Sequence, residues 1–164
     1  MKRIIVTGAN KGIGLGIVRR LLSEYDETFL ILAARSLERA EQSASLLLDE
    51  NKAWKNRLIT LKLDVELDDS VAEASEKIHS VFDGISEPIH CLINNAGVGD
   101  SYLGMQRVLD VNTWGVKRVC EAFLPLITKK QGRIVNVTSA SGPNFVAKCE
   151  ANFKYILTNP NVTW

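Results

Sequence analysis

The chain has 164 residues, 46% of them hydrophobic and 24% charged, which excludes a disordered protein and fits one domain with its own core. Twenty basic and nineteen acidic side chains leave a net charge of +1, so the global charge favours neither nucleic acid nor an anionic membrane as partner. No apolar run has the length of a transmembrane helix, and the N-terminus lacks a signal-peptide core. Because the three cysteines are widely spaced, we expect a cytoplasmic protein without disulfides or metal.

Short apolar runs alternate with amphipathic segments along the chain. The runs predict strands at 3–7, 29–34, 57–65, 89–94 and 132–139. The amphipathic segments predict helices at 12–25, from an N-cap at Ser36 to 48, from Asp68 or Asp69 to Gly84, and at 116–130 with a kink at Pro125. Strands that are apolar throughout indicate a parallel sheet with helices on both faces. The predicted fold class is therefore α/β, a doubly wound parallel sheet of Rossmann type with about five strands and right-handed crossovers.

The first strand leads into a glycine-rich loop, TGANKGIG at 7–14. Ligands of doubly wound sheets bind outside the carboxyl ends of the strands, where this loop lies. Gly8 would permit a tight turn, Gly12 would let a pyrophosphate approach the backbone, and Gly14 would let the helix pack closely on the strand. A purely structural role for the glycines stays open. A Walker loop is disfavoured because no Gly-Lys-Ser/Thr follows.

Two basic residues follow the first two strands. Arg35 ends the segment AAR, where a dinucleotide fold contacts the adenosine ribose, and Lys11 lies within the glycine loop. An acidic residue at the position of Arg35 would accept from a 2′-hydroxyl, whereas an arginine suits a 2′-phosphate. Hydrogen bonds to charged groups contribute about 1.5–3 kcal/mol each, which is enough to favour NADP(H) over NAD(H). The alternative is that both are solvated surface charges.

Five motifs, present together and in order, resemble those of the short-chain dehydrogenases/reductases. They are TGANKGIG, Asp64 after the third strand, NNAG at 94–97, Asn112 in the following helix, and GRIVNVTS ending at Ser139. The resemblance extends from Lys2 to about Gly142. Within the family, the glycine loop, AAR, LPLI and the segment after Ser139 look most like the NADPH-dependent carbonyl reductases.

This resemblance implies a nicotinamide dinucleotide, NADP(H), across the strand ends. The implied cofactor-binding residues are Gly8, Asn10, Lys11, Gly12, Ile13, Gly14, Arg35, Asp64, Val65, Asn95, Ala96 and Gly97. Asp64 and Val65 would lie near the adenine, and residues 95–97 would lie along the nicotinamide-side ribose. Asn94 would be partly structural.

The resemblance also implies two catalytic residues. In the family, hydride adds to a carbonyl carbon, a serine hydroxyl stabilises the oxygen, and a tyrosine with a lysine four residues later donates the proton. Ser139 would be that serine, and Asn112 would belong to the proton relay. Structural roles stay open for both, as a serine bonded to a loop and as a buried asparagine at a helix kink.

The tyrosine–lysine pair is missing from this sequence. Tyr155 is the only tyrosine after Ser139, and Asn159 stands four residues beyond it; Tyr25 and Tyr102 lack the lysine too. A free phenol has a pKa near ~10 and is poorly matched to proton transfer near neutrality. We therefore expect Tyr155 to be an ordinary residue.

The residues after Gly142 resemble the insertion that carbonyl reductases carry between serine and tyrosine. We expect a dinucleotide-binding Rossmann domain at 1–142, the start of the insertion at 143–164, and the rest of the fold beyond Trp164. Without that part, the fifth strand would be an exposed edge and the isolated chain would self-associate, whereas the full-length protein would be a monomer.

Three functions fit these residues. The first is an NADPH-dependent reductase of a small-molecule carbonyl substrate, of which this chain is the N-terminal cofactor-binding part, inactive alone. The second is a non-catalytic NADP(H)-binding protein or a truncated isoform. The third, an enzyme of the same fold that acts on a nucleotide sugar or a methyl donor, is disfavoured because NNAG and the Ser139 strand have no role there.

Overall fold

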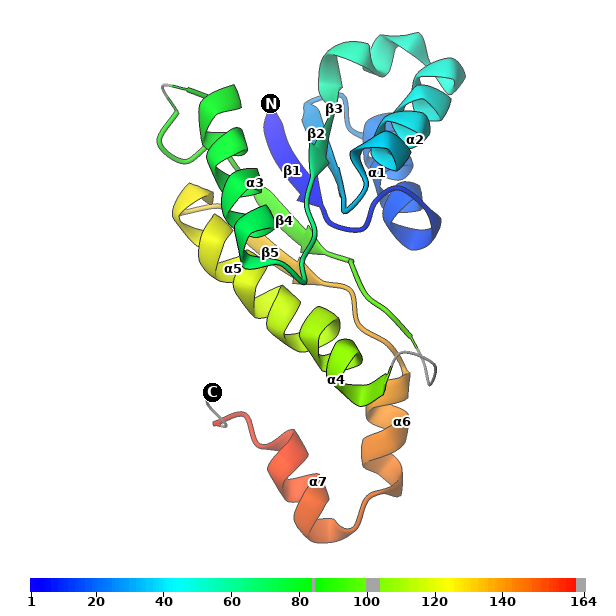
Figure 1. Ribbon diagram of the computed structural model, residues 1–164, viewed down its shortest axis with the longest axis vertical. Coiled ribbons are helices and arrows are strands. Elements are labelled where there is room, and N and C mark those ends of the chain that lie inside the picture. The colour runs from blue at the N-terminus through cyan, green and yellow to red at the C-terminus, as the bar shows by residue number, and fades with distance from the viewer. Residues whose placement is uncertain (84, 100–103, 162–164) are drawn as a thin grey trace.

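The computed structural model describes residues 1–83, 85–99 and 104–161, in which a sheet lies between two layers of helices (Figure 1). The elements are β1 (Lys2–Val6), α1 (Gly12–Glu24), β2 (Thr28–Ala34), α2 (Leu37–Glu50), η1 (Lys52–Arg57), β3 (Leu58–Lys62), α3 (Asp68–Val81), β4 (Cys91–Asn94), α4 (Gly104–Leu109), η2 (Asp110–Gly115), α5 (Val116–Phe123), η3 (Leu124–Leu126), β5 (Arg133–Asn136), α6 (Ser141–Lys148) and α7 (Ala151–Thr158). Gly84, the predicted end of the third helix, and Tyr102 and Trp164 lie outside the described residues.

The sheet has the strand order β3-β2-β1-β4-β5, and all four pairings are parallel. Helices cover both faces of the sheet, and the centre of the sheet is apolar on both. Ile5 of β1 pairs with Ile31 of β2 on one side and with Leu92 of β4 on the other. All three side chains are fully buried. The prediction of a doubly wound parallel sheet is confirmed.

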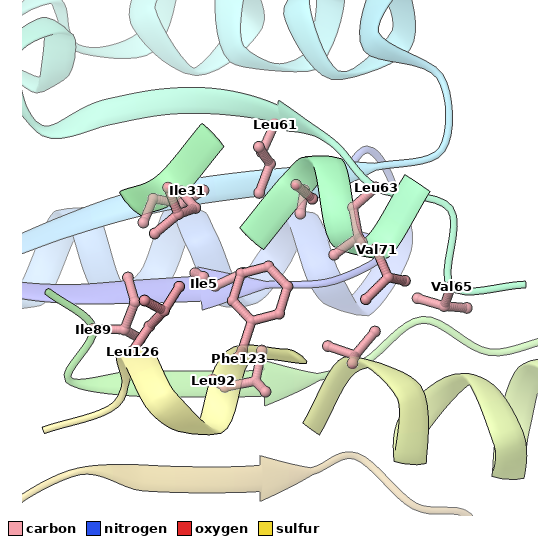
Figure 2. Packing of buried hydrophobic residues seen from close by; sticks show 14 of the residues in the cluster. Ile5, Ile31, Leu61, Leu63, Val65, Val71, Ile89, Leu92, Phe123 and Leu126 are labelled. Atoms are coloured by element: carbon pink, nitrogen blue, oxygen red, sulfur yellow. The ribbon is translucent and has the colours of Figure 1, made fainter. Parts of the chain in front are cut away.

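One apolar cluster lies on each face of the sheet. On one face, α3 and α5 pack against the strands, and Figure 2 shows the Phe123 ring of α5 next to Ile5 and Leu92. On the other face, α1 and α2 cover the strands through Val18, Leu22 and other buried residues. Burying one such side chain stabilises the fold by about 1.5–3 kcal/mol. Because each cluster contains many of them, the two helical layers are held firmly against the sheet.

Several predicted boundaries are confirmed or corrected. Ser36 caps α2, since its Oγ accepts a hydrogen bond from Arg39 N at 3.3 Å. The kink predicted at Pro125 is wrong: α5 ends at Phe123, and Pro125 lies in the 3-10 turn η3. Proline has no N–H to continue the helical hydrogen bonds, so the helix stops there. The irregular turn in this helical segment is instead the π-helical η2.

Strands β3 and β5 end earlier than the sequence predicts, at Lys62 and Asn136. Their ladders stop because the neighbouring strands end, β2 at Ala34 and β4 at Asn94. Beyond these points the chains diverge into loops, and this divergence opens space at the carboxyl edge of the sheet.

The last two helices lie apart from the three layers (Figure 1). No residue of α6 or α7 is buried, and β5, at the edge of the sheet, is exposed along its length. Large apolar side chains such as Phe145 and Ile156 are more than half exposed. Within the described ranges, no helix is long and apolar enough to cross a membrane.

Candidate functional site

A cavity of about 390 Å³ opens at the carboxyl ends of β1 to β4. Its walls include all twelve residues predicted to bind the cofactor: Gly8, Asn10, Lys11, Gly12, Ile13, Gly14, Arg35, Asp64, Val65, Asn95, Ala96 and Gly97. Leu63, Glu66, Val98 and Val111 also line it, and sequence reasoning missed these four. Residues that are far apart in the sequence thus meet where the fold predicts a ligand.

The glycine loop has the three features expected of a phosphate-binding turn. Gly8 has φ 63°, and a Cβ added to it would lie 2.8 Å from Ala96 Cα. Gly12 has φ 55° and open space around its missing Cβ, so a ligand can approach the backbone there. A Cβ on Gly14 would lie 2.4 Å from Asn95 Nδ2. Because α1 starts at Gly12 without a side-chain cap, its first amides remain available to an anion.

Hydrogen bonds fasten the NNAG segment to the glycine loop. Asn95 Nδ2 donates to the carbonyl oxygens of Thr7 at 2.9 Å and Gly8 at 3.2 Å. The backbone amides of Asn95 and Ala96 both donate to Thr7 Oγ1 at 3.0 Å. Thr7 therefore organises the cavity, a role that sequence reasoning missed although Thr7 opens the motif. Asn94 is structural, as predicted: it is buried, and its amide nitrogen donates to Asn136 Oδ1 at 2.9 Å.

Two positive side chains stand at the cavity without a partner among the described residues. Lys11 and Arg35 line it and are exposed. Neither side chain forms a hydrogen bond or ion pair with any residue that the structure describes. Unpaired cations beside a glycine turn and a helix N-terminus make this end of the cavity suited to phosphate groups.

Asn112 lies outside the cavity wall and supports it. Within η2, its Oδ1 accepts a hydrogen bond from Val98 N at 2.9 Å, and its Nδ2 donates to Val98 O at 2.8 Å. Both ends of the amide thus bind the backbone next to Gly97. The alternative role for Asn112 was that of a buried asparagine at a helix kink. Its hydrogen bonds to the backbone agree with a structural role, but its side chain is exposed and not buried.

Ser139 also lies outside the cavity lining, shortly after β5. Its Oγ accepts a hydrogen bond from Ser141 N at 3.1 Å and lies 3.1 Å from Ser141 Oγ. Ser141 was not singled out from the sequence, although the spacing of two hydroxyl residues in TSAS is compatible with such a local bond. Tyr155, on α7, is 72% exposed and absent from the cavity, in line with its expected role as an ordinary residue.

Comparison with known proteins decides which family has this site. The family model described as short chain dehydrogenase matches residues 2–151. The chain belongs to the short-chain dehydrogenase family.

Two curated relatives illustrate the range of proteins that this chain resembles. The mitochondrial D-beta-hydroxybutyrate dehydrogenase of Bos taurus is 34% identical over 148 residues, which are 86% of this chain and 42% of that protein. Carbonyl reductase [NADPH] 1 of Mus musculus is 28% identical over 166 residues, with 97% of this chain and 56% of that protein covered. The chain thus spans about half the length of these curated relatives.

A solved structure agrees with the fold of this chain. The NADPH-bound carbonyl reductase from chicken fatty liver superposes with a TM-score of 0.71 at 26% identity and covers 87% of this chain and 61% of that one. The resemblance to carbonyl reductases that the motifs indicated is therefore confirmed at the level of the family.

Proposed function

We propose that this chain is the NADP(H)-binding part of a short-chain oxidoreductase that reduces a small-molecule carbonyl compound. The observation that supports this most is the cavity at the carboxyl edge, where the glycine loop, the exposed side chains of Lys11 and Arg35, and the NNAG segment meet. The mouse and chicken relatives, whose names contain NADPH and carbonyl reductase, support the same cofactor and substrate class.

The residues present fit such a dinucleotide. The open space at Gly12 and the uncapped start of α1 would accept the pyrophosphate, and Lys11 and Arg35 would bind the 2′-phosphate. Asp64 and Val65 would contact the adenine, and Asn95 to Gly97 would lie along the nicotinamide-side ribose. When bound, NADPH supplies the hydride for carbonyl reduction.

The chain's own chemistry is limited to binding and orientation. Ser139 would donate a hydrogen bond to a carbonyl oxygen, and Asn112 would hold the backbone of Val98 beside the cavity. The sequence has no tyrosine followed four residues later by lysine. We therefore propose that these 164 residues bind NADPH without turning over a carbonyl substrate, and that the cytoplasm is their location.

A fluorescence titration with NADPH and with NADH tests the cofactor. We expect NADPH to bind at least about tenfold more tightly, because two charge-assisted contacts to the 2′-phosphate are lost with NADH. Lys11→Ala and Arg35→Ala should each weaken NADPH binding and leave NADH binding unchanged. Lys130→Ala, an exposed cation away from the cavity, is the control. Equal dissociation constants for the two nucleotides would contradict the proposal.

A second candidate is a purely NADP(H)-binding protein, favoured by the missing tyrosine–lysine pair. Incubation of the chain with NADPH and a panel of aldehydes and ketones, followed at the absorbance of NADPH, examines catalysis. No oxidation above background is expected from the isolated chain under either candidate. Sustained oxidation would show that another of its residues supplies the proton.

A further inference from the structure

An ion pair joins the loop after β3 to helix α4. Arg107 of α4 donates from Nε to Glu66 Oε1 at 3.1 Å and from Nη2 to Glu66 Oε2 at 3.3 Å. The two hydrogen bonds run side by side, the geometry in which a guanidinium holds a carboxylate most firmly. Glu66 lines the cavity, whereas Arg107 does not.

Other contacts fix the same loop. Arg118 of α5 donates from Nη1 to Val65 O at 2.6 Å and pairs with Asp68. A Cβ on Gly115 of η2 would lie 3.0 Å from Val65 Cγ2, so helix and loop already touch. Within the loop, Asp64 Oδ1 accepts from Glu66 N at 3.1 Å. The loop at 64–67 thus takes its position from α4, η2 and α5.

The ion pair also sets the charge of the cavity at this end. Both Asp64 and Glu66 line the cavity and carry negative charge, which opposes the binding of an anionic dinucleotide. Arg107 lies close enough to both that its pKa is raised, first by the hydrogen bond and charge of Glu66 and then by the charge of Asp64. Without Arg107, the Glu66 carboxylate would remain at the cavity uncompensated.

We propose that Arg107 is a positioning residue for the dinucleotide, which fixes the loop at 64–67 and neutralises Glu66 at the adenine end of the cavity. This role rests on the proposed function and deepens it, because it assigns cofactor affinity to a side chain outside the cavity lining. Two other roles are a direct contact between Arg107 and the nucleotide, and an ion pair that only stabilises the fold. Each predicts a different pattern of nucleotide affinities among variants of Arg107 and Glu66.

The loop is examined first, without any nucleotide. Hydrogen exchange of the backbone amides at 64–68 is measured in the chain and in Arg107→Gln, Glu66→Gln and the double variant. Each of the three should exchange faster there by a similar factor, because each breaks the same pair. Lys117→Gln, which breaks the exposed Lys117–Glu121 pair on α5, is the matched control and should leave this segment unchanged. Unchanged exchange in Arg107→Gln would overturn the loop-fixing role.

Affinity is then measured for the adenine half of the cofactor alone, with adenosine 2′,5′-bisphosphate as the probe. Arg107→Gln should bind about threefold to tenfold more weakly, the range of coupling between neighbouring groups. Glu66→Gln should lose less affinity, because it breaks the ion pair but also removes the negative charge that repels the nucleotide. The double variant should recover to the affinity of Glu66→Gln.

Recovery in the double variant separates the possible roles. A direct contact from Arg107 to the phosphate would leave the double variant as weak as Arg107→Gln, and that result would overturn the proposal. A merely stabilising pair would lower the melting temperature and leave the affinity of all variants equal, which would overturn it as well. If the unsubstituted chain binds no dinucleotide, the proposed function fails, and the exchange measurement still decides whether Arg107 fixes the loop.

Discussion

At the scale of single residues, two glycines of α1 differ only in their surroundings. A Cβ on Gly14 would lie 2.4 Å from Asn95 Nδ2 and 2.7 Å from Gly8 O, whereas a Cβ on Gly16 would meet nothing within 4 Å. Gly14→Ala should therefore destabilise the fold by about 1–3 kcal/mol through overpacking and should weaken NADPH binding.

Gly16→Ala is the matched control. It should stabilise the helix by up to about 1 kcal/mol, because alanine has the higher helix propensity. Urea unfolding of both variants checks the two signs, and a titration with NADPH checks the affinity. A stable Gly14→Ala variant with unchanged affinity would show that α1 can move away from Asn95 without cost.

The residues of the cavity wall could be predicted wherever a motif marks them. All twelve predicted positions line one cavity. They could be predicted because glycine loops and strand ends have a recognisable local pattern. Glu66 and Arg107 could not be predicted, since their pairing joins positions 41 residues apart in the sequence and has no local signature. Ser139 and Asn112 were predicted as catalytic residues, and that role stays a prediction.

At the scale of elements, the π-helical η2 presents Asn112 to the backbone at Val98. Asn112→Ala removes two hydrogen bonds, and we expect a loss of about 1–2 kcal/mol in stability together with faster hydrogen exchange at Val98. Asn112→Asp should give no rescue, because its second oxygen would face the Val98 carbonyl. Gln106→Ala, which removes a neighbouring bond to Asp110, is the control. Rescue by aspartate would contradict the role of the donated bond.

The turn between η3 and β5 should give the fold a dependence on pH. Lys129 N donates to Glu87 Oε2 at 3.0 Å, and this bond, followed by that of the Lys129 ammonium, lowers the pKa of Glu87. The folded-state pKa thus lies below the unfolded-state value near ~4.3, and the stabilisation is complete above that value. It is lost as the pH falls through the folded-state pKa.

Thermal unfolding of the chain and of Glu87→Gln across pH measures this contribution. The difference in melting temperature should be largest above about pH 5 and should disappear in stronger acid, where both side chains are neutral. A difference that grows as the pH falls would have the wrong sign for a lowered pKa.

The types of the five strands and of helices α1, α2, α3 and α5 followed from periodicity, but their ends did not, and α4, α6 and α7 were not predicted. The apolar runs at 57–65 and 132–139 continue past the last ladder bonds, and only the neighbouring strands determine where pairing stops. The kink was expected at Pro125 because proline is the local signal, whereas η2 depends on tertiary contacts such as that between Gly115 and Val65.

At the scale of the whole molecule, β5 is an open edge. Its Ile134 and Val135 are 40% and 45% exposed, and its backbone pairs with β4 alone in the five-stranded sheet. Unpaired edge strands associate with other strands, so we expect the chain to self-associate as concentration rises. Sedimentation at several concentrations measures this. Val135→Lys, which places a charge on the edge, should shift the chain toward monomer. A sharp monomer at high concentration would contradict the expectation.

Amide NMR spectra recorded during a titration with NADPH show whether the carboxyl edge of the sheet binds this nucleotide. We expect saturable shifts at Gly8, Gly12, Arg35, Asp64 and Gly97, which line the cavity, and little change at Lys129, which precedes β5 at the amino ends of the strands. Shifts confined to other surfaces, or none at saturating NADPH, would contradict it.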